Sequence, residues 1–252
     1  MRNQSNPKQK SKMPKIQLKS ACKIAVSIGL LGCGIAHGEG LTGQYLATGN
    51  FSTQDRLMPS MNNRLTMNYA PTWTTGNFDF RLEQYVENSF HGTNDAMVRE
   101  RKFEGQVNYN YPLTPQLSAT AGVLRHENHT FRDNYFWGVA GLVWSGDIAP
   151  DTGLTVGALA EKRNKGGRLF YDLSAAVEHK FREKYGAFAS AHVYENLGEF
   201  DPTPTHKREY EIGLNYYPNK RYTAGVSYFY HQQIGDPTDR FSFVKLKLGV
   251  NF

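Results

Sequence analysis

An alternation of apolar and polar residues with a period of two constrains this chain most, and it extends from about Leu41 to the C-terminus. The last segment shows it best, since five apolar residues share one face: Val244, Leu246, Leu248, Val250 and Phe252. The other face holds Lys245 and Lys247 and only one large apolar residue, Phe243. Successive side chains of a β-strand point to opposite faces, so the pattern predicts strands with one face in an apolar phase.

The alternation recurs along the chain and predicts about twelve strands. Their expected ranges are 41–50, 62–73, 78–89, 100–111, 117–127, 135–145, 154–163, 168–181, 187–197, 207–217, 222–232 and 241–252. These lengths suit the ~9–11 residues that a tilted strand needs to cross a bilayer. Short, turn-rich connections such as 112–116 and 147–153 alternate with generally longer polar loops such as 90–99. The sequence therefore predicts an all-β fold, a transmembrane antiparallel up-and-down β-barrel of about twelve strands with both ends on the periplasmic side.

A soluble β-sandwich or lipocalin-like barrel would also alternate, but with its apolar face inward. The strand lengths, an export signal and the terminal Phe252 favour the cell outer membrane of a Gram-negative bacterium instead. An aromatic residue that ends an alternating strand resembles the C-terminal assembly signal of outer-membrane barrels, which their assembly machinery recognises. Phe252 is therefore the expected assembly signal.

Aromatic residues gather near the ends of the predicted strands and indicate two interfacial girdles. The girdle near the short turns would comprise Trp73, Phe78, Tyr109, Tyr111, Trp144, Phe181, Tyr216, Tyr222 and Phe252. The girdle near the longer loops would comprise Phe51, Phe90, Tyr135, Trp137, Tyr171, Phe200 and Tyr230.

Residues 1–38 have the features of a secretory signal peptide, which leaves 39–252 as the barrel. A basic segment precedes a short apolar run at 24–31, and Ala36 and Gly38 offer small residues at a cleavage site. Two alternatives remain open: Met13 as the true start, and a lipoprotein signal in which Cys33 is lipidated. Seven of the 29 Lys and Arg residues lie in this leader, so the barrel carries 22 against 23 acidic residues. The basic balance thus gives no reason to expect nucleic-acid binding.

Both cysteines, Cys22 and Cys33, also lie in the leader, which excludes a disulfide scaffold or a thiolate metal site in the barrel. Residues 125–129 contain two His and one Glu, but a metal needs three or four converging ligands, and a loop start is the simpler interpretation. The His-x-Ser-Asn pattern of outer-membrane phospholipases does not occur, nor does Gly-x-Ser-x-Gly, Walker A or His-Glu-x-x-His. The sequence therefore predicts no enzyme, no catalytic residue, no metal and no cofactor.

If the apolar face points outward, many charged residues point into the lumen. The acidic ones are Asp79, Glu83, Glu104, Glu161, Asp172, Glu178, Glu209 and Glu211. The basic ones include seven candidates for a solute track: Arg64, Arg81, Arg163, Arg168, Lys180, Lys245 and Lys247. Such charges either line a narrow, water-filled passage or form a lattice of ion pairs that satisfies the interior.

One part of this wall is expected to be more cationic than the rest. Because the last strand closes on the first, Lys245 and Lys247 should lie beside Thr42, Gln44 and Thr48, with few acidic neighbours on that side. A cationic stripe of this kind would suit sugars that carry a carboxylate.

Residues 103–123, FEGQVNYNYPLTPQLSATAGV, resemble the strand–turn–strand segments of the oligogalacturonate-specific monomeric porins of the KdgM type, which include sialic-acid channels. The resemblance implies a monomeric channel whose narrow pore is lined by basic residues and passes acidic oligosaccharides. This chain departs from that pattern in its many inward acids.

Two functions follow. The first is an outer-membrane channel for passive diffusion of small hydrophilic solutes, acidic oligosaccharides among them. The second is a non-conducting structural or accessory barrel in envelope integrity or secretion. The expected partners are outer-membrane lipid, the barrel assembly machinery and, for the channel, the solute.

Overall fold

The computed structural model describes residues 41–52, 60–91, 96–129, 133–164, 169–196, 206–234 and 240–252. The expected signal peptide, both cysteines and Arg168 lie outside these residues. The described residues form twelve strands: β1 (Leu41–Ser52), β2 (Ser60–Tyr69), β3 (Asn77–His91), β4 (Ala96–Pro112), β5 (Leu117–Asn128), β6 (Asp133–Ala149), β7 (Thr152–Arg163), β8 (Leu169–Lys180), β9 (Tyr185–Asn196), β10 (His206–Asn219), β11 (Tyr222–Ile234) and β12 (Arg240–Asn251). No helix in the described part is long and apolar enough to cross a membrane.

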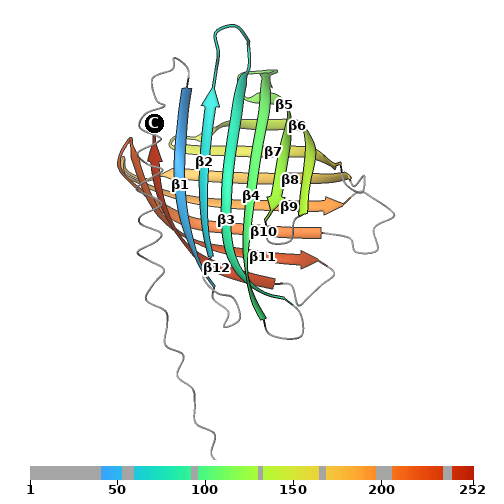
Figure 1. The fold of residues 1–252 in the computed structure, drawn as a ribbon. Coiled ribbons are helices and arrows are strands. Elements are labelled where there is room, and N and C mark those ends of the chain that lie inside the picture. Colours follow the sequence, from blue (N-terminus) through green and yellow to red (C-terminus); the bar gives the residue numbers. More distant parts are fainter. Residues whose placement is uncertain are drawn as a thin grey trace, which may run out of the picture.

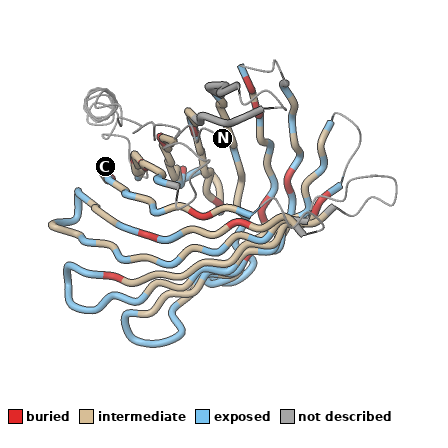
Figure 2. Tube along the Cα trace, turned by 90° about the horizontal axis from the view of Figure 1, so that it is seen from below, coloured by how far each residue is buried: buried red, intermediate tan, exposed pale blue. Residues whose placement is uncertain are grey.

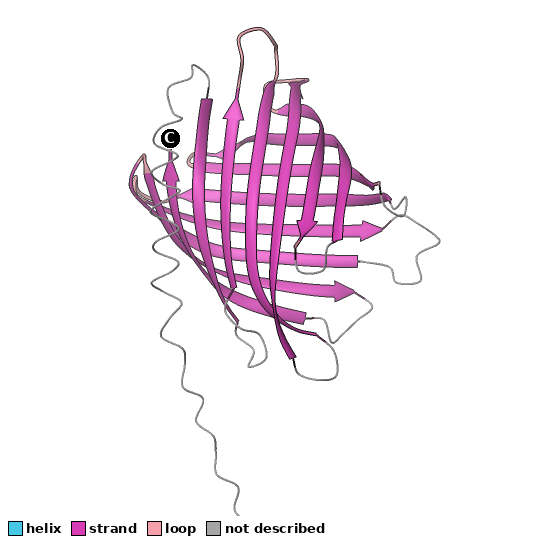
Figure 3. Cartoon of the chain, in the orientation of Figure 1, coloured by secondary structure: helices cyan, strands magenta, loops and turns pink. Residues whose placement is uncertain are grey.

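Each strand pairs antiparallel with the next along the chain, and β1 pairs with β12, so the sheet closes on itself (Figures 1 and 3). Closure satisfies the backbone hydrogen-bonding groups of both edge strands, which an open sheet in a membrane would leave exposed. The predicted up-and-down barrel of about twelve strands is confirmed.

Most strand boundaries differ from the expected ranges by a few residues, and two of the differences have a local cause. β2 ends at Tyr69 instead of residue 73, because Pro71 has no N–H to donate to a ladder. β6 extends into the segment 147–153, which was expected to be a turn, and ends at Ala149. Its pairing with β7 shifts register between Asp147 and Ala149. A tight turn at 150–151 then reverses the chain, and Asp151 takes a φ of 59°, a conformation that Asp tolerates better than most residues.

The outer wall is apolar and the inner wall is polar. Large apolar side chains are exposed on the outside of many strands, as at Ile212 (63%) and Leu248 (64%), whereas Glu83, on the inner face, is 1% exposed. Figure 2 shows that buried positions are few and scattered along the tube rather than gathered in one core. A soluble barrel would show the reverse distribution, so the wall is built to face lipid.

The aromatic girdle near the short turns is largely as expected. The rings of Trp73 and Phe78 have centroids 6.1 Å apart, and Tyr216 packs at 5.3 Å against Tyr185, which was not among the expected residues. On the loop side, the expectation that Tyr135 and Trp137 belong to the outer girdle was wrong. Both rings line the lumen, and Phe136 faces outward instead. The ladder places Trp137 opposite Leu124 and Arg163, both of which line the lumen, so its side chain must point the same way.

Candidate functional site: the lumen

Four cavities follow one another inside the barrel. The loop-side cavity has a volume of about 640 Å³ and shares Arg64, Tyr85 and Glu209 with a lysine cavity of about 320 Å³. The lysine cavity shares Leu46 and Lys247 with a turn-side cavity of about 610 Å³. The turn-side cavity shares Glu178 and Tyr217 with a cavity of about 840 Å³ at the short-turn end of the barrel, the mouth cavity. Because neighbouring cavities share lining residues, they trace a route along the barrel.

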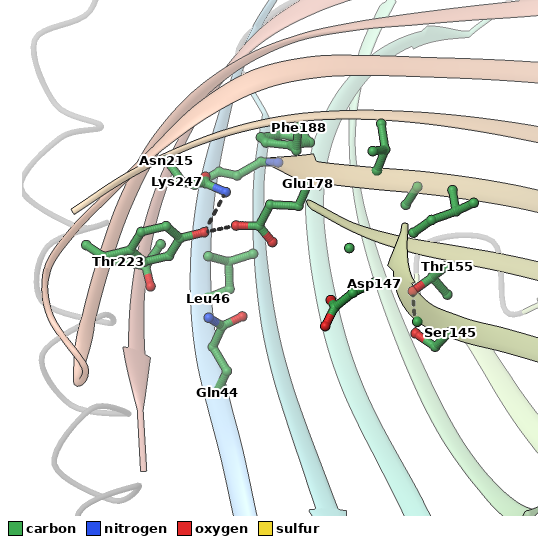
Figure 4. A pocket seen from close by; sticks show the side chains of 16 residues that line it. Gln44, Leu46, Ser145, Asp147, Thr155, Glu178, Phe188, Asn215, Thr223 and Lys247 are labelled. Atoms are coloured by element: carbon green, nitrogen blue, oxygen red, sulfur yellow. Dashed lines mark hydrogen bonds between the residues drawn. The ribbon is translucent and has the colours of Figure 1, made fainter. Parts of the chain in front are cut away.

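Polar side chains from many strands converge on the turn-side cavity (Figure 4). Asn215 of β10 donates a hydrogen bond to the Tyr217 hydroxyl at 3.1 Å, and that hydroxyl donates to Glu178 of β8 at 2.5 Å. The same Glu178 and Tyr217 line the mouth cavity together with Lys180, a predicted solute-track residue. This end of the lumen is therefore hydrophilic and lined in part by mutually bonded groups.

Glu83 is the centre of the first ion-pair network in the loop-side cavity. Its Oε1 accepts hydrogen bonds from Arg64 Nε at 3.0 Å and Nη2 at 2.8 Å, and from Asn62. Arg81 lies 3.9 Å from Glu83 Oε2 and 3.9 Å from Glu104 Oε2. Two expected track residues are thus paired with acids: Arg64 with Glu83 on the neighbouring strand, and Arg81 with Glu83 on its own strand and with Glu104 on β4.

A second network joins four strands through alternating acids and histidines. His192 of β9 contacts Asp172 of β8 through Nε2, and its Nδ1 lies 3.6 Å from Glu209 Oε2 of β10. The other oxygen of Glu209 lies 3.0 Å from His231 Nδ1 of β11. These residues therefore hold one another in fixed positions across the wall.

Glu211 of β10 changes the expected charge of the last strand. The ladder confirms that Lys247 lies opposite Thr48, but Lys245 lies opposite Asn50, and Thr42 is not opposite either lysine. Lys245 Nζ donates to Glu211 Oε2 at 3.0 Å, and Lys247 Nζ donates to Glu211 Oε1. The expectation that these lysines have few acidic neighbours considered only β1, whereas the carboxylate reaches them from β10, beyond β11.

The expected track residues within the described part are spread over the cavities, and Arg64 and Lys247 each line two of them. Arg64, Lys245 and Lys247 line the lysine cavity, while Arg81 and Arg163 line the loop-side cavity. Whether a solute contacts them stays a prediction.

An aromatic cluster in the loop-side cavity was missed by the sequence analysis. Phe170 of β8 lies between Trp137 of β6 and Tyr194 of β9, with ring centroids 4.8 and 4.9 Å away. Arg163 of β7 lies over the Tyr135 ring at 3.6 Å. The strand parity held the necessary signal, since Phe170 falls on the charged, inward face of the segment 168–182.

No protein-family model matches this chain, and no curated protein matches it in sequence. Solved structures do match in fold. A KdgM porin in complex with disordered oligogalacturonate is 12% identical with a TM-score of 0.52, covering 84% of this chain and 99% of that one. The NanC porin is 15% identical with a TM-score of 0.57, covering 82% and 98%. LpxR from Salmonella typhimurium is 10% identical with a TM-score of 0.54, covering 82% and 99%.

The fold and the apolar outer wall define the class of protein: the chain is a twelve-stranded β-barrel of the outer membrane. The expected resemblance to KdgM-type porins is confirmed for the fold. At 12–15% sequence identity, the resemblance shows a shared fold and not a shared function.

The expectation that the chain is not an enzyme has to be corrected. LpxR, whose barrel matches this one as well as those of the porins do, is an enzyme. The fold is therefore shared by channels and enzymes, and the lack of a recognised catalytic motif does not decide between them.

Proposed function

We propose that this protein is an outer-membrane channel through which small hydrophilic solutes diffuse passively. The series of four cavities carries the proposal, because each shares lining residues with the next from the loop side to the turn-side mouth. Charged, amide and hydroxyl groups in their walls can replace the hydration of a polar solute. The similarity of the barrel to two porins supports the same function.

The charges of the lumen favour weak ion selectivity. Lys and Arg line the four cavities in the same number as Asp and Glu, and several form ion pairs with one another. Histidines aside, the described wall therefore has no net charge with which to concentrate acidic oligosaccharides. Saccharides remain the solute class that we propose, with acidic sugars as one case to be tested.

Single-channel recording in planar bilayers tests the proposal, with Asn215→Trp as the informative variant. Asn215 lines the turn-side cavity, so an indole there should lower the conductance. Leu214→Trp is the matched control, because Leu214 is the next residue on β10 and is 53% exposed on the outer wall. A protein that inserts without conducting would refute the channel, and equal conductance of the two variants would refute a route past Asn215.

A non-conducting barrel in envelope integrity or secretion is the second candidate. The ion pairs around the buried Glu83 favour it, because a lattice of this kind can fill a lumen instead of lining a passage. The same recordings separate the two candidates.

A further inference from the structure

The loop-side cavity has two unlike walls. One wall, from β6 to β9, carries the aromatic cluster of Trp137, Phe170 and Tyr194. The facing wall, from β2 to β4, carries the ion pairs around Glu83. An ordinary ion passage needs no large apolar surface, so the aromatic wall requires another explanation.

The aromatic wall is rigidly supported. Phe170 is 3% exposed and packs against both neighbours, with its ring only 16° from parallel to that of Tyr194. Trp137 and Tyr194 are half-buried, their ring centroids lie 6.1 Å apart, and both line the cavity. They form a preorganised platform. Because these side chains are already ordered in the folded protein, binding a ligand costs little further side-chain entropy.

Carboxylates lie at the edge of this platform. Asp172 of β8 is directly opposite Tyr194 in the ladder, and Glu161 of β7 is directly opposite Phe170. Both acids line the same cavity. An apolar ring surface bordered by hydrogen-bond acceptors matches a pyranose ring, which has an apolar C–H face and hydroxyl donors around its edge.

We propose that the platform of Trp137, Phe170 and Tyr194 is a binding subsite for the ring of an uncharged saccharide. One face of the sugar stacks on Trp137, and the Tyr194 ring, whose plane is 56° from that of Trp137, packs against the sugar from the side. The sugar hydroxyls donate hydrogen bonds to Asp172 and Glu161. An uncharged sugar is favoured over an acidic one because Asp172 and Glu161 would repel a uronic acid, while the Arg163 guanidinium, 5.9 Å from the Trp137 ring, already lies over the Tyr135 ring at 3.6 Å. The proposal rests on the proposed channel and names the solute class that the channel takes.

Tryptophan fluorescence offers a direct test, since the sequence contains three tryptophans. In the double variant Trp73→Phe, Trp144→Phe, Trp137 is the only tryptophan left. Titration of the detergent-solubilised barrel with maltotriose, a neutral trisaccharide, should change its emission saturably, and digalacturonate should act only at concentrations at least about tenfold higher. In the control variant Trp73→Phe, Trp137→Phe, the only tryptophan left is Trp144, which does not line the cavity. Its emission should not change when maltotriose is added.

Substitution of the platform provides the second arm. Tyr194→Ala, made in the Trp137-only background, should weaken maltotriose binding about tenfold, equivalent to ~1.4 kcal/mol. Tyr194→Phe retains the ring and should bind like the parent, as should Val193→Ala, the adjacent residue on β9. If Tyr194→Ala fails to fold, the Tyr194→Phe and tryptophan arms still decide.

The possible outcomes separate the subsite from the channel. Conductance without a maltotriose response at Trp137 would refute the subsite and leave the channel. A maltotriose response without conductance would refute the channel and leave a sugar-binding barrel. Stronger binding of digalacturonate than of maltotriose would overturn the uncharged class of ligand.

Discussion

Gly43 and Phe252 exchange two backbone hydrogen bonds, from Gly43 N to Phe252 O at 2.8 Å and from Phe252 N to Gly43 O at 2.9 Å. They join the first strand to the last residue of the chain, one position beyond the end of β12. The phenyl ring of Phe252 also lies over Gly43, where a Cβ would come within 2.5 Å of it. The barrel therefore closes through a close contact between an aromatic ring and a residue without a side chain.

Deletion of Phe252 should lower the amount of folded barrel in the outer membrane and leave export intact. The deletion removes both closing hydrogen bonds and the ring that packs on Gly43. A closed barrel resists detergent until it is heated, so folded protein is measured as the band that shifts on boiling. Phe252→Tyr keeps the ring and serves as the control. Equal levels of folded protein for the deletion and the parent would contradict the role of Phe252 as an assembly signal.

Gly43→Ala should destabilise the barrel by about 1–3 kcal/mol, the usual cost of overpacking. The added methyl group would clash with the Phe252 ring and with the backbone oxygen of Thr66, at 2.5 and 2.8 Å. Gly138→Ala is the matched control, because a Cβ at Gly138 meets nothing within 4 Å. Urea unfolding midpoints in detergent compare the two variants, and a Gly43→Ala midpoint as high as that of Gly138→Ala would show that closure is looser than the contact implies.

The alternation in the sequence was enough to predict the barrel, because lipid outside and water inside impose opposite demands on successive residues. It failed on β6, where Tyr135, Trp137 and Val139 point inward among outward Phe136 and Leu142. Apolar residues on both faces remove the contrast on which the prediction depends. The loss of contrast coincides with the aromatic cluster, so the sequence was least informative beside a candidate binding surface.

Strand parity predicted which side chains enter the lumen but not their partners. Arg64 pairs with Glu83 on the adjacent strand, and a ladder argument could have found this contact. Lys245 and Lys247 pair with Glu211 across an intervening strand, which requires the curvature of the closed wall. Contacts of the second kind depend on barrel diameter and side-chain reach, which the alternation does not encode.

Glu83→Gln should lower the stability of the barrel, because it leaves Arg64 and Arg81 facing an uncharged amide. The Glu83 side chain is fully buried, whereas both arginines are about one-third to two-fifths exposed, so we expect about 1–3 kcal/mol rather than the larger loss of a fully buried pair. Glu127→Gln breaks a pair with Arg125, whose side chain is 54% exposed, and should cost less than about 1 kcal/mol. Equal urea midpoints for the two variants would show that the Glu83 network contributes little.

The charges of the lumen set the ion selectivity of the channel, which is measured as the reversal potential in a salt gradient. Glu211→Gln removes the carboxylate that binds both Lys245 and Lys247, so their ammonium groups lose its compensating negative charge. In a narrow lumen, where water is limited, this charge acts more strongly than in bulk solution. We expect a several-fold shift of selectivity towards anions.

The opposite substitution supplies the internal control. Replacing Lys245 and Lys247 with Glu places four carboxylates around the lysine cavity, together with Glu209 and Glu211, and should shift selectivity towards cations. If a solute track exists there, permeation of acidic sugars should rise with Glu211→Gln and fall with the double substitution, because both depend on the same local potential. Shifts of the same sign in the two proteins, or no shift in either, would show that these lysines do not face the permeating ions. An unchanged reversal potential in the Glu211 variant alone would mean that another group replaces the lost charge.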